Sequence, residues 1–343
     1  MIEMLAVKRR SSRGRALNWA DAVISALLVS AALTACDRQG ERAETPREAP
    51  REGPGVPEPE HGAPVPADSS STGPLSATPP APRYVPYRID AASPFLRWAA
   101  SLGPERRLLV LKLNRIDLEH ARQGDTLAIP ESFAEGVDSA GAESAQPPAA
   151  IDELAFAPFP LALAALDSAP KLLAISRRVQ AFGAYERGRL VRWGPTSTGK
   201  KDTPTPDGFF HVNWQAKETI STEDSTWVLP WYANFETRRG LSIHQYALPG
   251  YPASHACVRL LAPDAMWLYD WAEQWLVASD GHTILAPGTP ILIFGDYRFG
   301  KRRPWRRLVE DPLAASVSAA EIDSSLAPHM AKLREQARER ERE

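Results

Sequence analysis

Short apolar runs separated by turn residues fill the chain from residue 172 to residue 295. Runs of this length that are rich in β-branched and aromatic residues predict strands, and Glu186-Arg187-Gly188 between two of them is a hairpin signal. The predicted strands span residues 172–175, 179–185, 189–195, 209–214, 240–244 and 291–295. The pattern therefore predicts a mainly β domain.

One helix interrupts this β pattern and is predicted over residues 263–277. Pro263 stands near its start, as is common in a first helical turn. Two shorter helices are predicted upstream, over residues 95–100 and 106–115. The apolar residues of the long helix recur at helical spacing and are expected to pack in the core: Trp267, Leu268, Trp271, Trp275 and Leu276.

Composition divides the chain into six segments. Between residues 37 and 83 the chain is rich in Pro, Gly, Ser, Ala and Glu, with almost no large apolar residue, which predicts a disordered linker. The C-terminal tail is rich in Arg and Glu and predicts a solvated helix. The segments are an N-terminal stretch (1–36), the linker (37–83), a small α/β module (84–130), a second linker with an apolar lead-in (131–167), the β domain (168–297) and the charged tail (298–343).

Charge and histidine spacing limit the functional classes. The net charge of the 343 residues is −2, which gives no electrostatic case for nucleic-acid binding. The histidines other than His244 and His255 are scattered, without the close spacing of zinc sites. The sequence therefore predicts no metal and no cofactor.

Cys257 is the strongest candidate for chemistry, in the string Ser254-His255-Ala256-Cys257-Val258-Arg259-Leu260. A thiol attacks a carbonyl as the thiolate, so it needs a nearby base or positive charge. His244 lies upstream, across the bend Pro249-Gly250-Tyr251-Pro252, and two strand ends joined by such a loop can come within reach of each other. The alternative is that Cys257 is only a small buried apolar residue.

Residues 241–260, LSIHQYALPGYPASHACVRL, resemble the active-site signature of the L,D-transpeptidase catalytic domain. That signature carries His, a variable loop, then Ser/Thr-His-Gly-Cys, an apolar residue and Arg or Asn. Residues 172–210 resemble the opening hairpin of the family, its Ser-Thr-Gly strand end and its Thr-Pro-x-Gly loop. The resemblance implies an L,D-transpeptidase-like β-sandwich with one principal helix, preceded by the small α/β module and the disordered linker.

The resemblance implies a role for each matching residue. Cys257 matches the nucleophile and His244 the general base, whose ring would be oriented by the backbone carbonyl of Gln245. The backbone N–H of Cys257 and a neighbouring N–H at Ala256 would bind the oxyanion. Arg259 matches a position expected to contact substrate, with a surface salt bridge as the alternative.

The family implies peptidoglycan stem peptides as the partner. Cys257 would attack the bond between diaminopimelate and D-alanine of a tetrapeptide stem, release D-alanine and pass the acyl group to an amine. A hydrolase or carboxypeptidase that uses the same thioester, and a wall-binding lipoprotein without catalysis, are the alternatives. Four further residues are candidates for substrate binding, with packing alone as the alternative for the two aromatic ones: Ser254, His255, Trp231 and Tyr232.

The sequence departs from the family signature at Ala256, where the family has Gly. A positive φ costs a residue with a Cβ atom about 1 kcal/mol or more, whereas Gly adopts it freely. Ala256 is therefore predicted to have a negative φ.

The N-terminus predicts export and anchoring. Basic residues from Lys8 to Arg15 precede a mostly apolar stretch over residues 19–33, which is typical of a secretory signal. Leu33-Thr34-Ala35-Cys36 resembles the bacterial lipobox, which implies a lipidated Cys36 and a membrane anchor on the periplasmic side of the cell envelope. Asp37 resembles the residue that retains some lipoproteins at the inner membrane. An ordinary cleaved signal or a single membrane anchor is the alternative.

The small module resembles a glycan binder in its second half. Residues 113–117 and 123–130 are similar to the end of a lysin motif, a βααβ unit, whereas the usual opening of that motif is missing. The resemblance implies contact with glycan strands. A docking domain that packs on the catalytic domain is the alternative.

Overall fold

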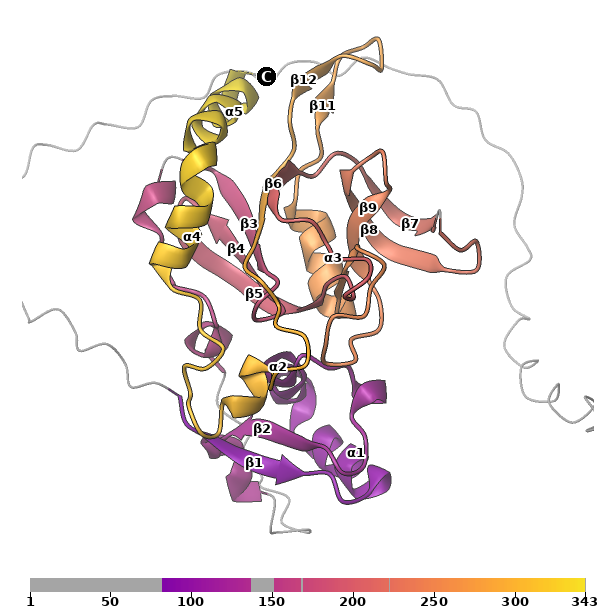
Figure 1. Ribbon diagram of the computed structural model, residues 1–343, viewed down its shortest axis with the longest axis vertical. Helices are drawn as coiled ribbons and strands as arrows, with labels where there is room; N and C mark the ends of the chain where they lie inside the picture. Colours follow the sequence, from indigo (N-terminus) through magenta and orange to yellow (C-terminus); the bar gives the residue numbers. More distant parts are fainter. Residues whose placement is uncertain (1–81, 137–150, 168, 222, 343) are drawn as a thin grey trace, which may run out of the picture. The chain divides into compact units, whose positions relative to one another are not determined.

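A computed structural model describes residues 82–136, 151–167, 169–221 and 223–342 (Figure 1). The longest part of it is a mixed sheet of nine strands: β3 (Lys171–Ser176), β4 (Ala181–Glu186), β5 (Arg189–Ser197), β6 (Gly208–His211), β7 (Gln215–Ile220), β8 (Val228–Glu236), β9 (Leu241–Gln245), β10 (Val258–Leu260) and β13 (Pro290–Phe294). Their order across the sheet is β6-β13-β3-β4-β5-β10-β9-β8-β7. The mainly β fold class is confirmed.

The sheet is buried on both faces, and it curls. Leu173 and Leu172, neighbours in β3, point into two different apolar clusters, as strand alternation requires. Ile291 of β13 shares its cluster with Ile243 of β9, although these strands lie far apart in the sheet. The two halves of the sheet therefore face each other across one core, so the predicted sandwich is built from a single continuous sheet.

Helix α3 (Ala262–Trp271) packs into that core between the two halves (Figure 1). It begins with a Pro in its first turn, and the rings of Trp267 and Trp271 stack 5.1 Å apart. The predicted end at residue 277 is wrong, because tertiary partners take the backbone groups beyond Trp271. The N–H of Glu273 donates to the Thr289 hydroxyl, 2.8 Å away. The chain then enters a small hairpin, β11 (Leu276–Val277) and β12 (Ile284–Ala286).

The small module consists of β1 (Tyr84–Arg88), α1 (Ala92–Ser101), α2 (Gly103–Asn114) and β2 (Thr126–Pro130). Strands β1 and β2 pair antiparallel. The buried Asn114 side chain ties α2 to β2, since its amide donates to the Ala128 carbonyl at 2.8 Å and its oxygen accepts from the Ala128 N–H at 2.9 Å. Arg115 then ends the helix in the left-handed region, with φ 60°.

A buried ionic cluster joins this module to the sheet and to α3. The Lys112 ammonium, fully buried, lies 2.9 Å from the buried Asp264 carboxylate and 2.6 Å from Glu153. It also donates to the backbone carbonyl of Trp193 at 2.9 Å. Buried charges are tolerated when they are paired and hydrogen-bonded, so these contacts fix α2 in place against the catalytic half of the chain.

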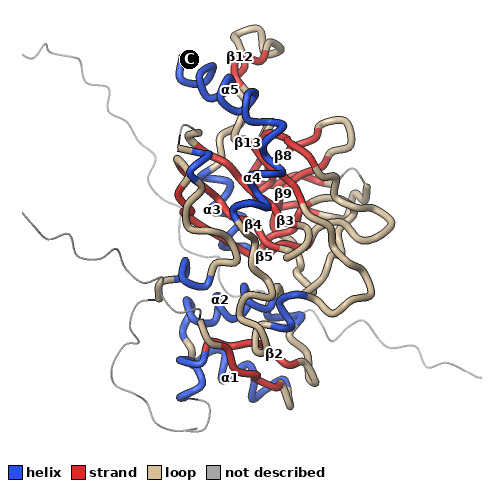
Figure 2. The backbone as a smooth tube through the Cα atoms, turned by 60° about the vertical axis from the view of Figure 1, so that its left-hand side comes forward, coloured by secondary structure: helices blue, strands red, loops and turns tan. Residues whose placement is uncertain are grey.

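The C-terminal tail contains helices, as predicted, and it also packs through buried apolar side chains, which the sequence prediction of a solvated helix did not include. Helices α4 (Ala319–Leu326) and α5 (Met330–Arg342) lie beside the sheet in both views (Figures 1 and 2). Seven apolar residues of the tail are buried: Trp305, Leu308, Ala315, Val317, Ile322, Leu326 and Leu333.

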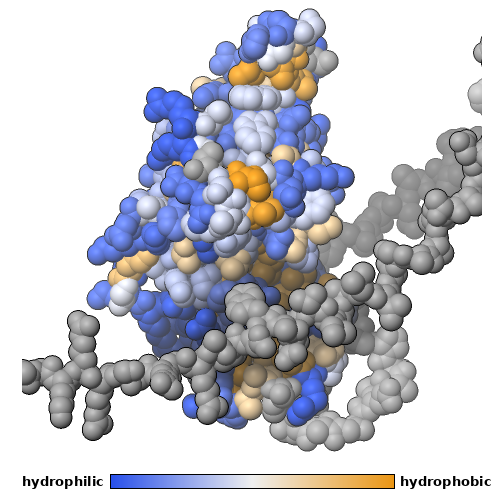
Figure 3. All heavy atoms as spheres, turned by 90° about the vertical axis from the view of Figure 1, so that its right-hand side faces the viewer, coloured by the Kyte–Doolittle hydropathy of each residue, from blue (hydrophilic) through white to orange (hydrophobic). Residues whose placement is uncertain are grey.

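Short 3₁₀ helices complete the described residues, at Leu118–His120, Glu131–Gly136, Glu153–Phe156, Ala164–Leu166, Pro304–Arg307 and Ala327–His329. The face that carries β7 is mainly hydrophilic, with small separate apolar patches (Figure 3). Within the described ranges, no helix has the length and apolar character needed to cross a membrane. The predicted signal peptide with Cys36, and nearly all of the predicted linker over residues 37–83, lie outside the described residues.

Candidate active site

The site is built on two neighbouring parallel strands, β9 and β10. Val258 pairs with Ile243 and Arg259 with His244. Because side chains alternate along a strand, Ser242 and His244 lie on one face of β9. Cys257 precedes β10 by one residue, so it is on the same face as Arg259, and the pairing places it beside Ser242. Four polar side chains thus share one face of two adjacent strands.

His244 is buried and held in one orientation. Its side chain is 4% exposed, and its Nδ1–H donates to the backbone carbonyl of Gln245, 2.9 Å away. The proton on Nδ1 leaves the lone pair on Nε2 free to accept another. Burial lowers the pKa of His244 to about 4, with a smaller lowering from Arg259, against the raising effect of the Gln245 hydrogen bond. The ring is therefore neutral at pH 7 and able to act as a base.

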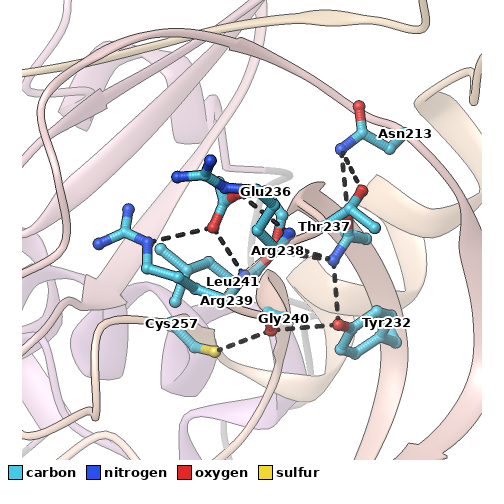
Figure 4. Close-up of polar contacts among 10 residues, drawn as sticks. Asn213, Tyr232, Glu236, Thr237, Arg238, Arg239, Gly240, Leu241 and Cys257 are labelled. Atoms are coloured by element: carbon cyan, nitrogen blue, oxygen red, sulfur yellow. Dashed lines mark hydrogen bonds and ion pairs between the residues drawn. The ribbon is translucent and has the colours of Figure 1, made fainter.

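Cys257 is a free, partly exposed cysteine. It lines a small cavity together with His244. Its Sγ lies 3.6 Å from the Ser242 hydroxyl. It also lies 4.0 Å from the carbonyl oxygen of Gly240 (Figure 4). The Ser242 hydroxyl donates a hydrogen bond to the sulfur, which orients the Cys257 side chain. The serine is thus placed to assist the thiol.

Behind Cys257, a network of polar side chains fixes the turn between β8 and β9. The Tyr232 hydroxyl donates to the Gly240 carbonyl at 3.2 Å, and the Asn234 amide donates to the Tyr232 hydroxyl at 3.2 Å. Asn213 in turn donates to the Asn234 side chain at 3.0 Å (Figure 4). Tyr232, a predicted substrate-binding residue, therefore lies behind the nucleophile and not among the residues that line the cavity.

Trp231, the other predicted aromatic, does not line the cavity either. Its ring packs edge-on against Tyr269 of α3, with centroids 5.6 Å apart. Trp227, from the same stretch of sequence, lies in the cavity wall, and its ring is 5.1 Å from that of His255. Of the aromatic residues in this stretch, Trp227 therefore lies in the cavity wall, whereas Trp231 and Tyr232 do not.

Ala256 has φ 82°, so the predicted negative φ is wrong. The carbonyl of Ala256 accepts a hydrogen bond from the Thr205 hydroxyl at 2.8 Å, and the same hydroxyl accepts from the Gly199 N–H at 2.8 Å. This buried bridge holds the peptide after Ala256 in the orientation that a glycine would adopt freely. The strain of an L-residue in this region is of order 1–2 kcal/mol.

The strand end after β5 supports the whole nucleophile loop. The Ser254 N–H donates to the Thr198 carbonyl at 3.1 Å, and the Lys200 N–H donates to the Ser254 carbonyl at 2.9 Å. The Lys200 ammonium also donates to Nε2 of His255 at 2.9 Å. The residues of the Ser-Thr-Gly and Thr-Pro signals therefore support residues 254–257 through hydrogen bonds.

The cavity brings together five predicted residues, His244, Ser254, His255, Cys257 and Arg259, and its remaining lining comes from Ser221, Glu223, Trp227, Leu229 and Tyr246. Within the described residues, Arg259 forms no ion pair with a carboxylate. Its guanidinium lies 4.6 Å from the centroid of the Tyr246 ring and stays available to an anionic ligand. Among the same residues, no group of three or more His, Cys, Asp or Glu could hold a metal ion.

Sequence reasoning missed Ser242, Lys200, Thr205 and Tyr246. Ser242 had a signal, because it precedes His244 by two residues on a predicted strand and must share its face. Thr205 belongs to the Thr-Pro signal, but nothing in the sequence tells that its hydroxyl binds the Ala256 carbonyl. Tyr246 and Lys200 carried no signal, since both act through the loop geometry.

We expect the free energy of unfolding to depend on pH through His244. The pKa of its ring is 6.5 in the unfolded chain and about 4 in the folded one, so the unfolded state binds more protons between these values. This contribution is fully present above about pH 6.5 and is lost as the pH falls through about 4, by up to about 3 kcal/mol. Urea unfolding at pH 4.5 and pH 7 measures it. His244→Gln should show a smaller pH dependence than the wild type, and the exposed control His282→Gln should not.

Replacing the strained alanine should leave stability almost unchanged. Ala256→Gly relieves about 1–2 kcal/mol of backbone strain and loses about 1 kcal/mol each of methyl burial and chain entropy. The control Ala253→Gly removes a half-buried methyl group in the same loop where φ is not positive, and it should lower the free energy of unfolding by about 1–2 kcal/mol, because both losses occur without any relief of strain. Thermal unfolding of the two variants decides it. Equal losses would contradict the strain at Ala256.

Comparisons with known proteins agree with this geometry. Residues 171–293 match the YkuD family, the L,D-transpeptidase catalytic domain. No curated protein matches the chain at a significant level. Among solved structures, an L,D-transpeptidase from Stackebrandtia nassauensis is 23% identical with a TM-score of 0.31, over 38% of this chain and 58% of that one. An L,D-transpeptidase from Mycobacterium smegmatis is 21% identical with a TM-score of 0.30, over 37% of this chain and 59% of that one. L,D-transpeptidase 1 from Mycobacterium tuberculosis is 20% identical with a TM-score of 0.28, over 37% of this chain and 63% of that one.

This chain thus spans less than two thirds of the length of those solved proteins. Their identities and TM-scores are low, so the assignment depends on the domain match and on the residues that it contains. Cys257 and His244 both fall inside the matched segment. Residues 171–293 of the chain match the L,D-transpeptidase catalytic domain of the YkuD family, as the sequence predicts.

Proposed function

We propose that this protein is a cell-wall L,D-transpeptidase that acts on tetrapeptide stems of peptidoglycan. The observation that carries the proposal is the pairing of a neutral, oriented His244 with the free thiol of Cys257 in one cavity. A nucleophile beside a base that a third group orients is the arrangement needed for acyl transfer through a covalent intermediate.

Each half of the proposed reaction passes a proton through His244. Nε2 of His244 accepts the thiol proton, and the sulfur of Cys257 attacks the carbonyl carbon between diaminopimelate and D-alanine. The C–N bond breaks, the proton from His244 passes to the departing amine, and D-alanine leaves a thioester behind. An amine of a second stem then attacks the thioester, gives its proton to His244 and restores the thiol. Backbone N–H groups at Ala256 and Cys257 would stabilise the oxyanion in both halves.

The charges of the cavity suit this substrate. Stem peptides carry carboxylates, and Arg259 presents a guanidinium that is held against Tyr246 and has no carboxylate partner among the described residues. A planar guanidinium binds a carboxylate through two parallel hydrogen bonds. Arg259 would orient the donor stem, together with Ser254 and His255 in the neighbouring wall.

Two other outcomes use the same cavity. If water replaces the amine, the thioester is hydrolysed and the protein is a carboxypeptidase or hydrolase. If the strained Ala256 misdirects the oxyanion donors, the protein binds the wall without catalysis. With φ 82°, Ala256 has the backbone conformation that a glycine would adopt at this position. This favours an active enzyme over a protein that only binds the wall.

Removing either reacting side chain should stop the reaction. With tetrapeptide muropeptides as substrate, Cys257→Ala should abolish D-alanine release, and His244→Ala should slow it by about 10²–10⁴-fold, the usual contribution of a general base. Mass spectrometry of the products separates cross-linked stems from hydrolysed ones. The surface variant His282→Ala serves as control. A carbapenem should also add its mass to Cys257, and turnover by Cys257→Ala would overturn the mechanism.

We also propose that the enzyme is a lipoprotein anchored at the periplasmic side of the envelope, with the inner membrane preferred. The support is the sequence alone, namely the basic and apolar N-terminal stretch and the lipobox-like string that ends at Cys36. A lipid-anchored enzyme with a Pro-rich linker could reach the wall from the membrane.

Cys36→Ser should therefore move the protein from the detergent-soluble membrane fraction to the soluble periplasm, or leave an unprocessed precursor. Fractionation and the mass of the mature N-terminus measure this. A wild-type mature chain that starts elsewhere than Cys36, without acyl mass, would refute the anchor. The alternative of glycan binding by residues 84–130 needs a separate pull-down with isolated glycan strands.

A further inference from the structure

The loop between the two reacting residues is held by the small module. This loop, residues 246–257, leaves β9 just after His244 and returns at Cys257. Near its start, Leu248 forms two hydrogen bonds with Asp117 of the module. The Leu248 N–H donates to Oδ2 of Asp117 at 2.7 Å, and the Asp117 N–H donates to the Leu248 carbonyl at 3.0 Å.

The contact continues along the loop as close backbone packing. Ile116 forms a β-bridge with Pro249. Gly250 has φ 82°, and a Cβ atom there would lie 2.9 Å from Cγ2 of Ile116. The glycine is therefore required both by its backbone conformation and by the approach of the module. The loop and the module fit at this point without room for a side chain.

Asp117 itself is held from behind. Its Oδ1 accepts from the backbone N–H of His120 at 2.9 Å and also lies 2.7 Å from Nδ1 of the His120 ring. Just upstream, the buried Arg115 donates through Nε to the Val179 carbonyl at 3.0 Å, which fixes this stretch of the module to the catalytic domain. The Asp117 carboxylate, which accepts from the Leu248 N–H, is thus oriented by contacts within the module and does not depend on the loop for its position.

The loop reaches the chemistry through Tyr246, two residues before Leu248. The Tyr246 ring lies edge-on to the His244 ring, with centroids 5.9 Å apart, and carries the guanidinium of Arg259 on its face. The Tyr246 N–H donates to the Leu260 carbonyl at 3.1 Å. Movement of the loop at Leu248 would therefore be transmitted to Tyr246 and so to Arg259.

We propose that Asp117 is a positioning residue of the active site, which fixes the loop at Leu248 and thereby keeps Tyr246 against Arg259. The kinetic consequence rests on the proposed function, whereas the structural consequence does not. In this role the small module is a fixed wall of the catalytic domain. Of the residues 113–117 that resemble the end of a lysin motif, Ile116 and Asp117 contact the loop in place of a sugar.

The structural arm is amide hydrogen exchange in the full-length protein. Asp117→Ala removes the acceptor of the Leu248 N–H, and exchange at Leu248 should become faster by at least about tenfold, the effect of losing a hydrogen bond to a charged group. Asp117→Asn keeps one acceptor oxygen and should give an intermediate rate. Glu119→Gln, an exposed carboxylate on the same 3₁₀ turn, is the matched control and should leave Leu248 protected. Circular dichroism and thermal unfolding confirm that each variant is folded.

The kinetic arm uses a tetrapeptide muropeptide and, separately, iodoacetamide. Asp117→Ala should raise KM for the peptide by about tenfold with a smaller change in kcat, because Arg259 is expected to bind the carboxylate and not to take part in bond breaking. Alkylation of Cys257 by iodoacetamide, which needs no carboxylate site, should stay within about twofold of the wild type.

The outcomes separate the two proposals. If the wild type releases no D-alanine, the proposed function fails while hydrogen exchange still decides whether Asp117 fixes the loop. If Leu248 stays protected in folded Asp117→Ala, or if Glu119→Gln loosens it equally, the positioning role is overturned. It is likewise overturned if exchange accelerates but KM stays unchanged in an active enzyme. A fall in Cys257 alkylation that matches the loss of activity would indicate general damage to the site instead.

Discussion

The parallel pairing of β9 with β10 is the constraint on which the rest of the site depends. Register alone places His244 opposite Arg259, and so brings Cys257 beside Ser242. Parallel neighbours cannot be joined by a tight turn, so the chain must leave the sheet and return over about a dozen residues. That excursion would be mobile by itself, and it carries the nucleophile at its end. Much of the remaining structure supports this loop: Thr198 and Thr205 on one side, and Asp117 with Ile116 on the other.

The electrostatics of the site follow from the same arrangement. Burial between strands keeps His244 neutral, and the Gln245 carbonyl fixes which nitrogen bears the proton. Arg259, which pairs with His244 across the two strands, adds to the cost of a second proton on the ring. The ring is held by a backbone carbonyl and the guanidinium by an aromatic face, and among the described residues neither forms an ion pair with a carboxylate.

The sequence was informative wherever local pattern and tertiary structure agree. Short apolar runs predicted six of the nine strands of the sheet, and the Cys257 and His244 motifs predicted that these two residues lie close together. It failed where a distant partner decides. Helix α3 does not continue beyond Trp271 because the Thr289 hydroxyl accepts from the Glu273 N–H, and Ala256 keeps a positive φ because the Thr205 hydroxyl holds its carbonyl. Neither partner can be found by reading along the chain, and the buried face of the tail was masked by its charges.

The order of strands has a consequence for how the domain is made. Strand β3, the first of the sheet in sequence, pairs with β4 on one side and with the last strand, β13, on the other. Until residue 294 is available, β3 presents a bare row of backbone donors and acceptors, a template for pairing with other chains. Contacts of such long sequence separation also form slowly. Synthesis must therefore run past Cys257 and through β13 before the sheet can close, and a chain cut short between them would hold both His244 and Cys257 yet retain an open edge.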